Sequence, residues 1–383
     1  MKTPLWILLG AFVVSAQWTG AQGIAFEKAS WADALAKAKT QNKIIFLDAY
    51  TTWCGPCKMM DKNTFTDPKV GQLYNATFVN MQVDMEKGEG VDIARRYAVN
   101  AYPTLLFINA EGQVVHRALG YRDAEQFLAL GVEAADPAKN MAGLERRYAE
   151  GDRSPELMRA LIEAKATSRD PKAPEMVNEY LAGQKDLNTP ENRQVIFDYV
   201  NDPASPYFAV FMEHQPDYVK QFGKEEVASK KQMAVAQIAR TPTPLTPDEA
   251  MPQLQKAFGK DAAHYKHLYE MMYYQRLGNR DAFASSAVAY FDKADDVGAQ
   301  GLNEIAWYFF ENVDDKDQLK HALKWAERSI ALEEQYANLD TLAALHYKLG
   351  NPKDARKYAE KAIAKAKTTG EDYSSTEELL QKL

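Results

Sequence analysis

The chain has 383 residues, of which 46% are hydrophobic and 26% are charged, and this ordinary composition excludes a largely disordered or collagen-like chain. Its 46 Lys and Arg residues against 53 Asp and Glu residues give a formal charge of −7, so no nucleic acid is expected as a partner. Both cysteines, Cys54 and Cys57, lie in one motif, which excludes a zinc site built from four thiolates.

Residues 1–21 have the pattern of a secretory signal peptide. Lys2 supplies a positive charge, residues 5–14 are apolar, and Thr19 and Ala21 suit the residues before a cleavage site. We predict cleavage after Ala21 and a periplasmic or secreted protein, in a compartment where disulfides persist. The alternative is an uncleaved membrane anchor, although the apolar run is shorter than the roughly 20 residues that span a bilayer.

Residues 22–135 alternate between strand and helix patterns, which predicts one α/β domain. Strands are predicted where apolar residues are continuous or alternate, over residues 43–50, 78–84, 104–109 and 114–119. Helices are predicted around residues 31–38 and over 54–63, 68–73, 91–97 and 123–134. Strands separated by helices and followed by a terminal hairpin indicate a mixed sheet that helices cover on both faces.

After residue 135 the composition becomes typical of helices, rich in Ala, Glu, Lys and Leu. We predict a helical domain over 136–240, a linker with four prolines over 241–252, and helical repeats over 253–383. The repeat is visible in residues that recur 33 positions later: Ala322, Ala326 and Ile330 return as Ala355, Ala359 and Ile363. This spacing resembles tetratricopeptide (TPR) repeats, which are helix pairs of about 34 residues. The alternative is a helical bundle whose spacing is coincidental.

The motif Cys54-Gly55-Pro56-Cys57 carries the chemistry, because it lies where a predicted strand and a short loop meet the start of a helix. Unpaired N–H groups and the helix dipole stabilise a thiolate there and lower the pKa of the thiol. We therefore expect Cys54 to be the exposed nucleophile and Cys57 to resolve the mixed disulfide. Pro56 suits the first turn of a helix and stiffens the pair. The alternatives are a structural disulfide and the remnant of a metal site.

Residues 48–58, which read DAYTTWCGPCK, resemble thioredoxin. The tripeptide Tyr-Pro-Thr at 102–104, followed by an apolar strand, resembles the cis-proline loop of that family. Within the family, residues 64–68 and the strand 78–84 resemble the C-terminal domain of the bacterial transmembrane thiol–disulfide interchange protein. The resemblance covers about residues 26–135, and it implies an α/β thioredoxin fold with a mixed central sheet flanked by helices.

Asp48 lies six residues before Cys54 inside an apolar strand, so burial should raise the pKa of its carboxyl. The resemblance implies that Asp48 takes a proton from the resolving thiol as a general base, usually through water. Family members often carry a lysine near this aspartate, and the matching position here is Asn80, which leaves the raised pKa less well compensated. The alternative is that Asp48 ends the strand and is solvated.

The resemblance also implies a substrate surface around the cysteines. Pro103 is expected to be cis and to lie against the thiol pair, and the backbone of Tyr102 is expected to bind substrate as an added strand. We expect four further residues to contact substrate: Trp53, Gly55, Pro56 and Thr104. The alternatives are a trans-Pro103 at a strand start and a Trp53 that packs in the core.

These residues predict a thioredoxin-like thiol–disulfide oxidoreductase that serves cell redox homeostasis. By resemblance, Gly-Pro between the cysteines implies reduction of disulfides in exported proteins. We expect no cofactor beyond the redox-active disulfide Cys54–Cys57, a membrane thiol-transfer protein as electron donor, and a protein partner on the helical repeats. Two alternatives stay open: a redox-sensing scaffold that binds partners through its repeats, and an oxidase or isomerase that uses the same site.

Overall fold

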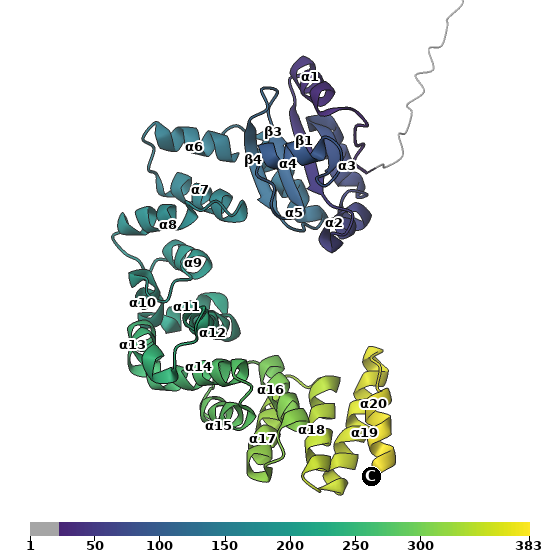
Figure 1. Ribbon diagram of the computed structural model, residues 1–383, viewed down its shortest axis with the longest axis vertical. Coiled ribbons are helices and arrows are strands. Elements are labelled where there is room, and N and C mark those ends of the chain that lie inside the picture. The colour runs from purple at the N-terminus through teal and green to yellow at the C-terminus, as the bar shows by residue number, and fades with distance from the viewer. Residues whose placement is uncertain (1–22) are drawn as a thin grey trace, which may run out of the picture. The chain divides into compact units, whose positions relative to one another are not determined.

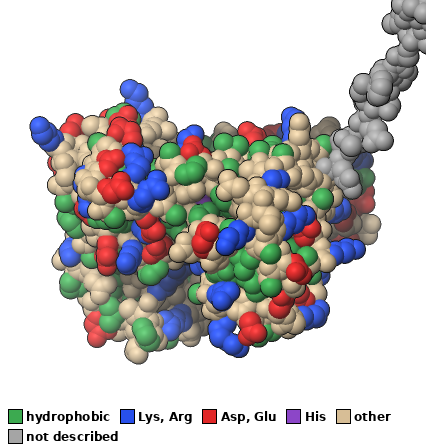
Figure 2. All heavy atoms as spheres, turned by 90° about the horizontal axis from the view of Figure 1, so that it is seen from above, with side chains coloured by type: hydrophobic (Ala, Val, Ile, Leu, Met, Phe, Trp, Pro, Cys, Tyr) green, Lys and Arg blue, Asp and Glu red, His purple; other side chains and the backbone are tan. Residues whose placement is uncertain are grey.

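The computed structural model describes residues 23–383, so the predicted signal peptide over 1–21 lies outside the described residues. The chain folds into two compact units, one that ends at Ala182 and one that spans Gly183–Leu383. None of the helices within residues 23–383 combines the length and the apolar character that crossing a membrane requires. Figure 2 shows one face of the molecule, on which acidic, basic and hydrophobic side chains are interspersed.

The first unit contains a four-stranded mixed sheet in the order β2–β1–β3–β4 (Figure 1). Its strands are β1 (Ile44–Tyr50), β2 (Phe78–Asp84), β3 (Thr104–Ile108) and β4 (Val114–Leu119). β1 runs parallel to β2 and antiparallel to β3, and β3 and β4 form an antiparallel hairpin. The predicted mixed sheet is confirmed, and each strand lies within one residue of its expected bounds.

Helices flank the sheet in the predicted order. They are α1 (Trp31–Gln41), α2 (Gly55–Met59), α3 (Pro68–Thr77), α4 (Gly90–Arg96) and α5 (Ala124–Ala135). The side chain of Asp67 caps the start of α3, and Asp123 forms a capping box with Gln126 at the start of α5. After α2 the helix widens into a π-helical turn, Met60–Thr64, which the sequence pattern did not reveal.

Hydrophobic side chains fill both faces of this sheet. α1 and α4 contribute to the core on one face, and α3 and α5 contribute to the core on the other. On the second face Tyr74 and Phe127 stack with ring centroids 4.2 Å apart, next to Phe46 and Phe107. Because successive strand residues point to opposite faces, a strand covered on both faces is apolar along its length. Asp48 is the charged exception within β1.

The first unit extends past residue 135, where we expected the α/β domain to end. It includes α6 (Met141–Ala149), α7 (Pro155–Thr167) and α8 (Ala173–Ala182), and α6 and α7 pack against β4. His116 of β4 is buried, and its Nδ1 accepts a hydrogen bond from the backbone N–H of Met141. Burial lowers the pKa of His116 to about 4, so the ring is neutral at pH 7. No local pattern reveals this contact, because the two residues lie 25 positions apart.

The second unit consists of helices and the loops that join them, which confirms the predicted helical region (Figure 1). Its helices are α9 (Pro190–Tyr199), α10 (Pro206–Glu213), α11 (Gln215–Phe222), α12 (Lys224–Ala239), α13 (Pro247–Phe258), α14 (Ala262–Arg276), α15 (Arg280–Phe291), α16 (Ala299–Asn312), α17 (Lys316–Leu332), α18 (Tyr336–Lys348), α19 (Pro352–Thr369) and α20 (Ser374–Lys382). Neighbouring helices pack as pairs, among them α14 with α15, α16 with α17, and α18 with α19.

Part of the predicted linker over 241–252 is helical. α13 begins at Pro247, and Thr246 and Glu249 form a capping box at its start. Pro247 occupies the first turn, where its missing N–H is not needed, and Pro252 is accommodated inside the helix. The irregular segment is therefore shorter than expected, because α13 begins at Pro247 and continues through Pro252, although an interior proline removes one hydrogen bond of the helix.

The residues of the predicted repeat occupy corresponding places in two helices. Ala322 and Ala326 are buried in α17, and Ala355 and Ala359 are buried in α19. The sequence Leu-Gly-Asn occurs at 277–279, between α14 and α15, and again at 349–351, between α18 and α19. Gly278 and Gly350 both have a positive φ, which suits the end of a helix. The assignment of these helix pairs to TPR repeats stays a prediction.

Candidate active site

The disulfide Cys54–Cys57 lies at the start of α2, after the loop that follows β1. Cys54 is the capping residue of this helix, and its Sγ accepts a hydrogen bond of 3.1 Å from the backbone N–H of Cys57. Pro56 lies in the first turn, as expected. The same N–H group can stabilise a thiolate on Cys54 after reduction, and the role of Cys54 as nucleophile stays a prediction.

Cys54 is less accessible than the sequence suggested. In the disulfide form it is 3% exposed, whereas the neighbouring Trp53 is 64% exposed. The expectation of an exposed Cys54 is wrong for the oxidised protein, because its bond to the buried Cys57 holds its sulfur against the first turn of α2. The alternative in which Trp53 packs in the core is also wrong.

The Tyr102–Pro103 peptide bond is cis, as predicted, and it directly precedes β3. The hydroxyl of Thr104 donates a hydrogen bond of 2.7 Å to the carbonyl of Ala101 across this loop. β3 runs antiparallel to β1, with Thr104 paired to Ala49. The proline loop therefore lies at the end of the two central strands where β1 finishes and the chain continues toward the cysteines.

Trp53 and Tyr102 form the border of the disulfide site. Their rings pack edge to face with centroids 5.8 Å apart. Both carboxylate oxygens of Glu86 lie 3.1 Å from the indole Nε1 of Trp53, which donates a hydrogen bond to them. The sequence reasoning missed Glu86, which lies 33 residues from Trp53 and belongs to no local motif. The border thus combines two aromatic rings with one carboxylate.

Gly55 and Pro56, the two residues between the cysteines, begin α2. A Cβ at Gly55 would meet no atom within 4 Å, so the backbone there is open to an approaching substrate. Within residues 23–383, no group of three or more His, Cys, Asp and Glu side chains is arranged to hold a metal ion.

Asp48 is buried within β1, with 1% of its surface exposed. Burial raises the pKa of its carboxyl to about 7; a hydrogen bond from Gln82 opposes the rise, and the charge of Asp61 adds to it. A carboxyl with a pKa near 7 can accept and release a proton at neutral pH. The alternative of a solvated Asp48 is wrong.

The residue beside Asp48 on β2 is Gln82 and not Asn80. The parallel register pairs Asp48 with Gln82 and places Asn80 opposite Phe46. The Nε2 of Gln82 donates to Asp48 Oδ2 at 3.1 Å, whereas the Nδ2 of Asn80 donates to the carbonyl of Tyr74. Because a shift of two residues keeps the same side chains on the same face, the alternating pattern could not distinguish these positions.

Gln82 also connects Asp48 to a second carboxylate. Its Nε2 donates to Oδ1 of Asp61 at 2.6 Å. Asp61 is an exposed residue of the π-helical turn that follows α2. Oδ1 of Asp48 is buried and makes no hydrogen bond to the described part of the chain, so this oxygen is free to accept a proton. The arrangement links the buried carboxyl of Asp48 to the surface through one amide.

Residues 31–135 match the family model of the thioredoxin-like domain. This part of the chain is therefore a thioredoxin-like domain of the kind found in thiol–disulfide oxidoreductases, with the disulfide Cys54–Cys57 at its helix start. The predicted resemblance to thioredoxin is confirmed for this domain.

The domain is similar to a part of the thiol:disulfide interchange protein DsbD. It is 43% identical over 100 residues to DsbD of Klebsiella pneumoniae subsp. pneumoniae, a match that covers 25% of this chain and 16% of that protein. DsbD of Haemophilus ducreyi is 40% identical over 93 residues, which covers 23% of this chain and 16% of that protein. The chain thus spans about a sixth of the length of these curated relatives.

One solved structure is also similar to a part of this chain. It is a candidate disulphide isomerase from Bacteroides thetaiotaomicron that is 50% identical, and the match covers 30% of this chain and 97% of that chain with a TM-score of 0.27.

Proposed function

We propose that this protein is an enzyme that reduces disulfide bonds of exported proteins by dithiol–disulfide exchange through Cys54 and Cys57. The observation that carries the proposal is the cysteine pair at the start of α2, with the buried carboxyl of Asp48 on the strand that leads to it. Similarity to thiol:disulfide interchange proteins supports exchange with disulfides. The Gly-Pro pair between the cysteines favours the reducing direction by its resemblance to thioredoxin.

The reaction starts with both cysteines reduced. The thiolate of Cys54 attacks one sulfur of the substrate disulfide, that bond breaks, and the other substrate sulfur leaves as a thiolate that takes up a proton. Asp48 then accepts the proton of the Cys57 thiol, directly or through water, and the Cys57 thiolate attacks the sulfur of Cys54. The substrate leaves with two thiols and the Cys54–Cys57 disulfide forms, so two electrons have passed to the substrate.

Substrate is proposed to bind along the border of the disulfide site. An extended segment would pair with the backbone of Tyr102 beside cis-Pro103 and Thr104, as an added strand. The exposed ring of Trp53 and the open backbone at Gly55 and Pro56 would contact the residues around the substrate cysteine.

Repeated turnover requires a dithiol that reduces Cys54–Cys57 again. A membrane thiol-transfer protein is the proposed donor, on the basis of the similarity to DsbD. The periplasm is the proposed compartment, because the pattern of residues 1–21 and an oxidisable cysteine pair both suit it. The helical region after Ala182 is proposed to bind a protein partner, since stacked helix pairs present extended surfaces.

The direction of electron flow is tested by the reduction potential of Cys54–Cys57, measured by equilibration with a glutathione series. A value near that of thioredoxin, about −270 mV, supports a reductase. A value near that of the oxidant DsbA, about −120 mV, contradicts the proposal and favours a disulfide oxidase or isomerase. In a parallel assay the wild-type chain should accelerate insulin reduction by dithiothreitol, and Cys54→Ser should not.

A further inference from the structure

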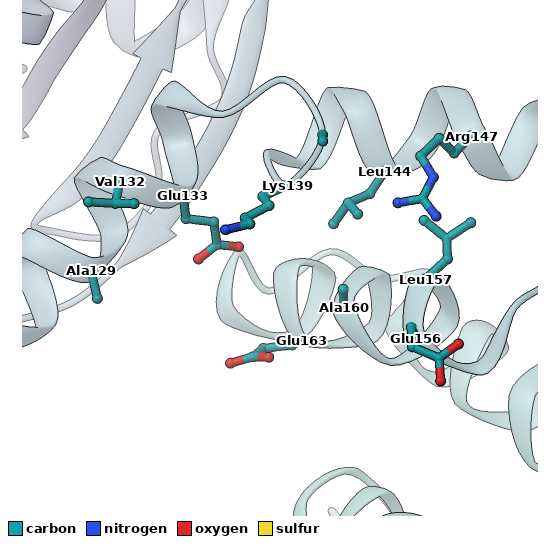
Figure 3. Close-up of a pocket in the computed structure, with 11 residues that line it drawn as sticks. Ala129, Val132, Glu133, Lys139, Leu144, Arg147, Glu156, Leu157, Ala160 and Glu163 are labelled. Atoms are coloured by element: carbon teal, nitrogen blue, oxygen red, sulfur yellow. The ribbon is translucent and has the colours of Figure 1, made fainter.

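A groove of about 500 Å³ lies between α5 and the helix pair α6–α7 of the first unit (Figure 3). Leu144 of α6 and Leu157 of α7 are buried beneath it, and Ala129, Val132 and Ala160 line its sides. Val132 is 52% exposed although apolar side chains lie beside it in the groove. The groove therefore leaves open an apolar surface whose burial would stabilise a complex.

Neighbouring parts of the fold hold the walls of this groove in place. α5 begins with the capping box of Asp123 and Gln126, and its inner face packs in the core of the sheet through Phe127 and Leu130. α6 and α7 pack against β4, where buried His116 accepts the hydrogen bond from the first residue of α6. The groove is thus formed before any ligand arrives, which lowers the entropic cost of binding.

The basic side chains at the border of the groove already have acidic partners. Lys139 lies 3.7 Å from the carboxylate of Asp136. Arg147 lies 2.8 Å from the carboxylate of Asp152. Each of these two cations therefore has an acidic partner within the protein.

The acidic side chains Glu133 of α5 and Glu163 of α7 also line the groove (Figure 3). Burial raises the pKa of Glu133, the charge of Glu163 raises it further, and Lys139 opposes the rise. The ring of His116 lies 4.0 Å from the Glu133 carboxylate, but burial keeps this ring neutral at pH 7. A cation placed beside Glu133 and Glu163 would relieve their mutual repulsion.

We propose that this groove docks a segment of a partner protein that presents two or three neighbouring apolar side chains together with a lysine or arginine. The apolar side chains would cover Val132, Ala129 and Ala160, and the cation would lie beside Glu133 and Glu163. A groove between helices suits an amphipathic segment, whose apolar residues enter while its charged residue meets the border. An acidic segment would be repelled by the same carboxylates.

This docking surface is separate from the disulfide site. Its lining residues come from α5, α6, α7 and the loop between α5 and α6, and none comes from α2 or the Pro103 loop. The proposal therefore goes beyond disulfide exchange, and substitutions in the groove are expected to leave insulin reduction unchanged.

The test uses the full chain and a library of fluorescein-labelled peptides of about 12 residues, with binding followed by fluorescence anisotropy. Each peptide carries two or three Leu or Phe residues next to either an arginine or a glutamate. We expect some of the arginine peptides to bind. Their glutamate counterparts should bind with an affinity that is lower by about tenfold or more. Glu133→Gln combined with Glu163→Gln should remove most of this difference. Val132→Asp should abolish binding by placing a charge on the apolar surface.

Val91→Asp is the matched control, because Val91 is a 41% exposed valine on α4, outside the groove. It should leave peptide binding unchanged. The proposal is overturned if no arginine peptide binds the wild-type chain, if arginine and glutamate peptides bind equally, or if Val132→Asp binds like wild type. Insulin reduction by the same variants shows that they are folded. A wild-type chain that fails to reduce insulin contradicts the proposed function and leaves the binding result unaffected.

Discussion

The side-chain amide of Gln82 donates a hydrogen bond of 3.1 Å to the buried carboxylate of Asp48. The same nitrogen lies 2.6 Å from the exposed carboxylate of Asp61. One side chain therefore holds the proposed general base and joins it to a group at the surface. A buried carboxylate is costly without such a donor, so this amide helps to determine when Asp48 is ionised.

Gln82→Leu should raise the pKa of Asp48 further, because it removes the hydrogen bond that favours the ionised form. A hydrogen bond worth about 1 kcal/mol corresponds to roughly 0.7 pKa unit. The measurement is the pH dependence of the rate at which Cys57 resolves a preformed mixed disulfide on Cys54. The inflection of this profile should move to higher pH.

Asp61→Asn is the matched comparison for that experiment. It removes a negative charge that raises the pKa of Asp48, so the inflection should move to lower pH. Opposite movements in the two variants are the expected result. Movement in the same direction would contradict one of the two effects on the pKa of Asp48, and the direction would show which one.

Asp48 also makes the stability of the first unit depend on pH. Its pKa is about 7 in the folded chain against an ordinary value of 3.8, so between these values the folded chain keeps a proton that the unfolded chain loses. The stability that protonated Asp48 gives to the folded chain is fully present below about pH 3.8 and is lost as the pH rises to about 7. At about 1.4 kcal/mol per pKa unit, the loss is on the order of 4 kcal/mol.

Asp48→Asn removes this titration, and urea unfolding of the oxidised protein measures the effect. As the pH rises from 4 to 8, wild type should lose a few kcal/mol of unfolding free energy that the variant keeps. The same slope of stability against pH in both proteins would show that Asp48 does not carry the dependence.

The two cysteines should respond differently to replacement by serine. Cys57→Ser leaves the nucleophile but removes the resolving thiol, so substrate should accumulate as a mixed disulfide on Cys54. Cys54→Ser should abolish both turnover and trapping. Non-reducing electrophoresis and mass spectrometry of the adducts measure these outcomes. An absence of adducts with Cys57→Ser would argue against the two-cysteine mechanism.

Glu86 should act on substrate binding through Trp53. Glu86→Ala removes the acceptor of the indole N–H and frees the exposed ring, so KM for a protein disulfide should rise about fivefold, equivalent to about 1 kcal/mol. The value of kcat should change little, because Glu86 touches neither cysteine in the proposed reaction. Glu111→Ala, at an exposed hairpin turn, is the control and should leave both constants unchanged. A fall in kcat alone would contradict the positioning role.

Local sequence was sufficient to predict the four strands of the α/β domain and the helices that flank them. The apolar run around Asp48 predicts a buried strand, and Cys54-Gly55-Pro56-Cys57 at a helix start predicts the redox pair. The resemblance of Tyr-Pro-Thr at 102–104 to the cis-proline loop of thioredoxin implies the cis bond that the structure contains. The strand and the helix start depend on residues close together in the chain, where periodicity, capping and turn preferences act.

Only the tertiary structure decided which distant residues meet these groups. Gln82 lies beside Asp48 across 34 positions, and the choice between Gln82 and Asn80 depends on the strand register that core packing selects. The contact of Trp53 with Glu86 spans 33 positions, and the docking of α6 on His116 spans 25. A local pattern specifies which face of an element is apolar, but the partner of that face is determined by how whole elements pack.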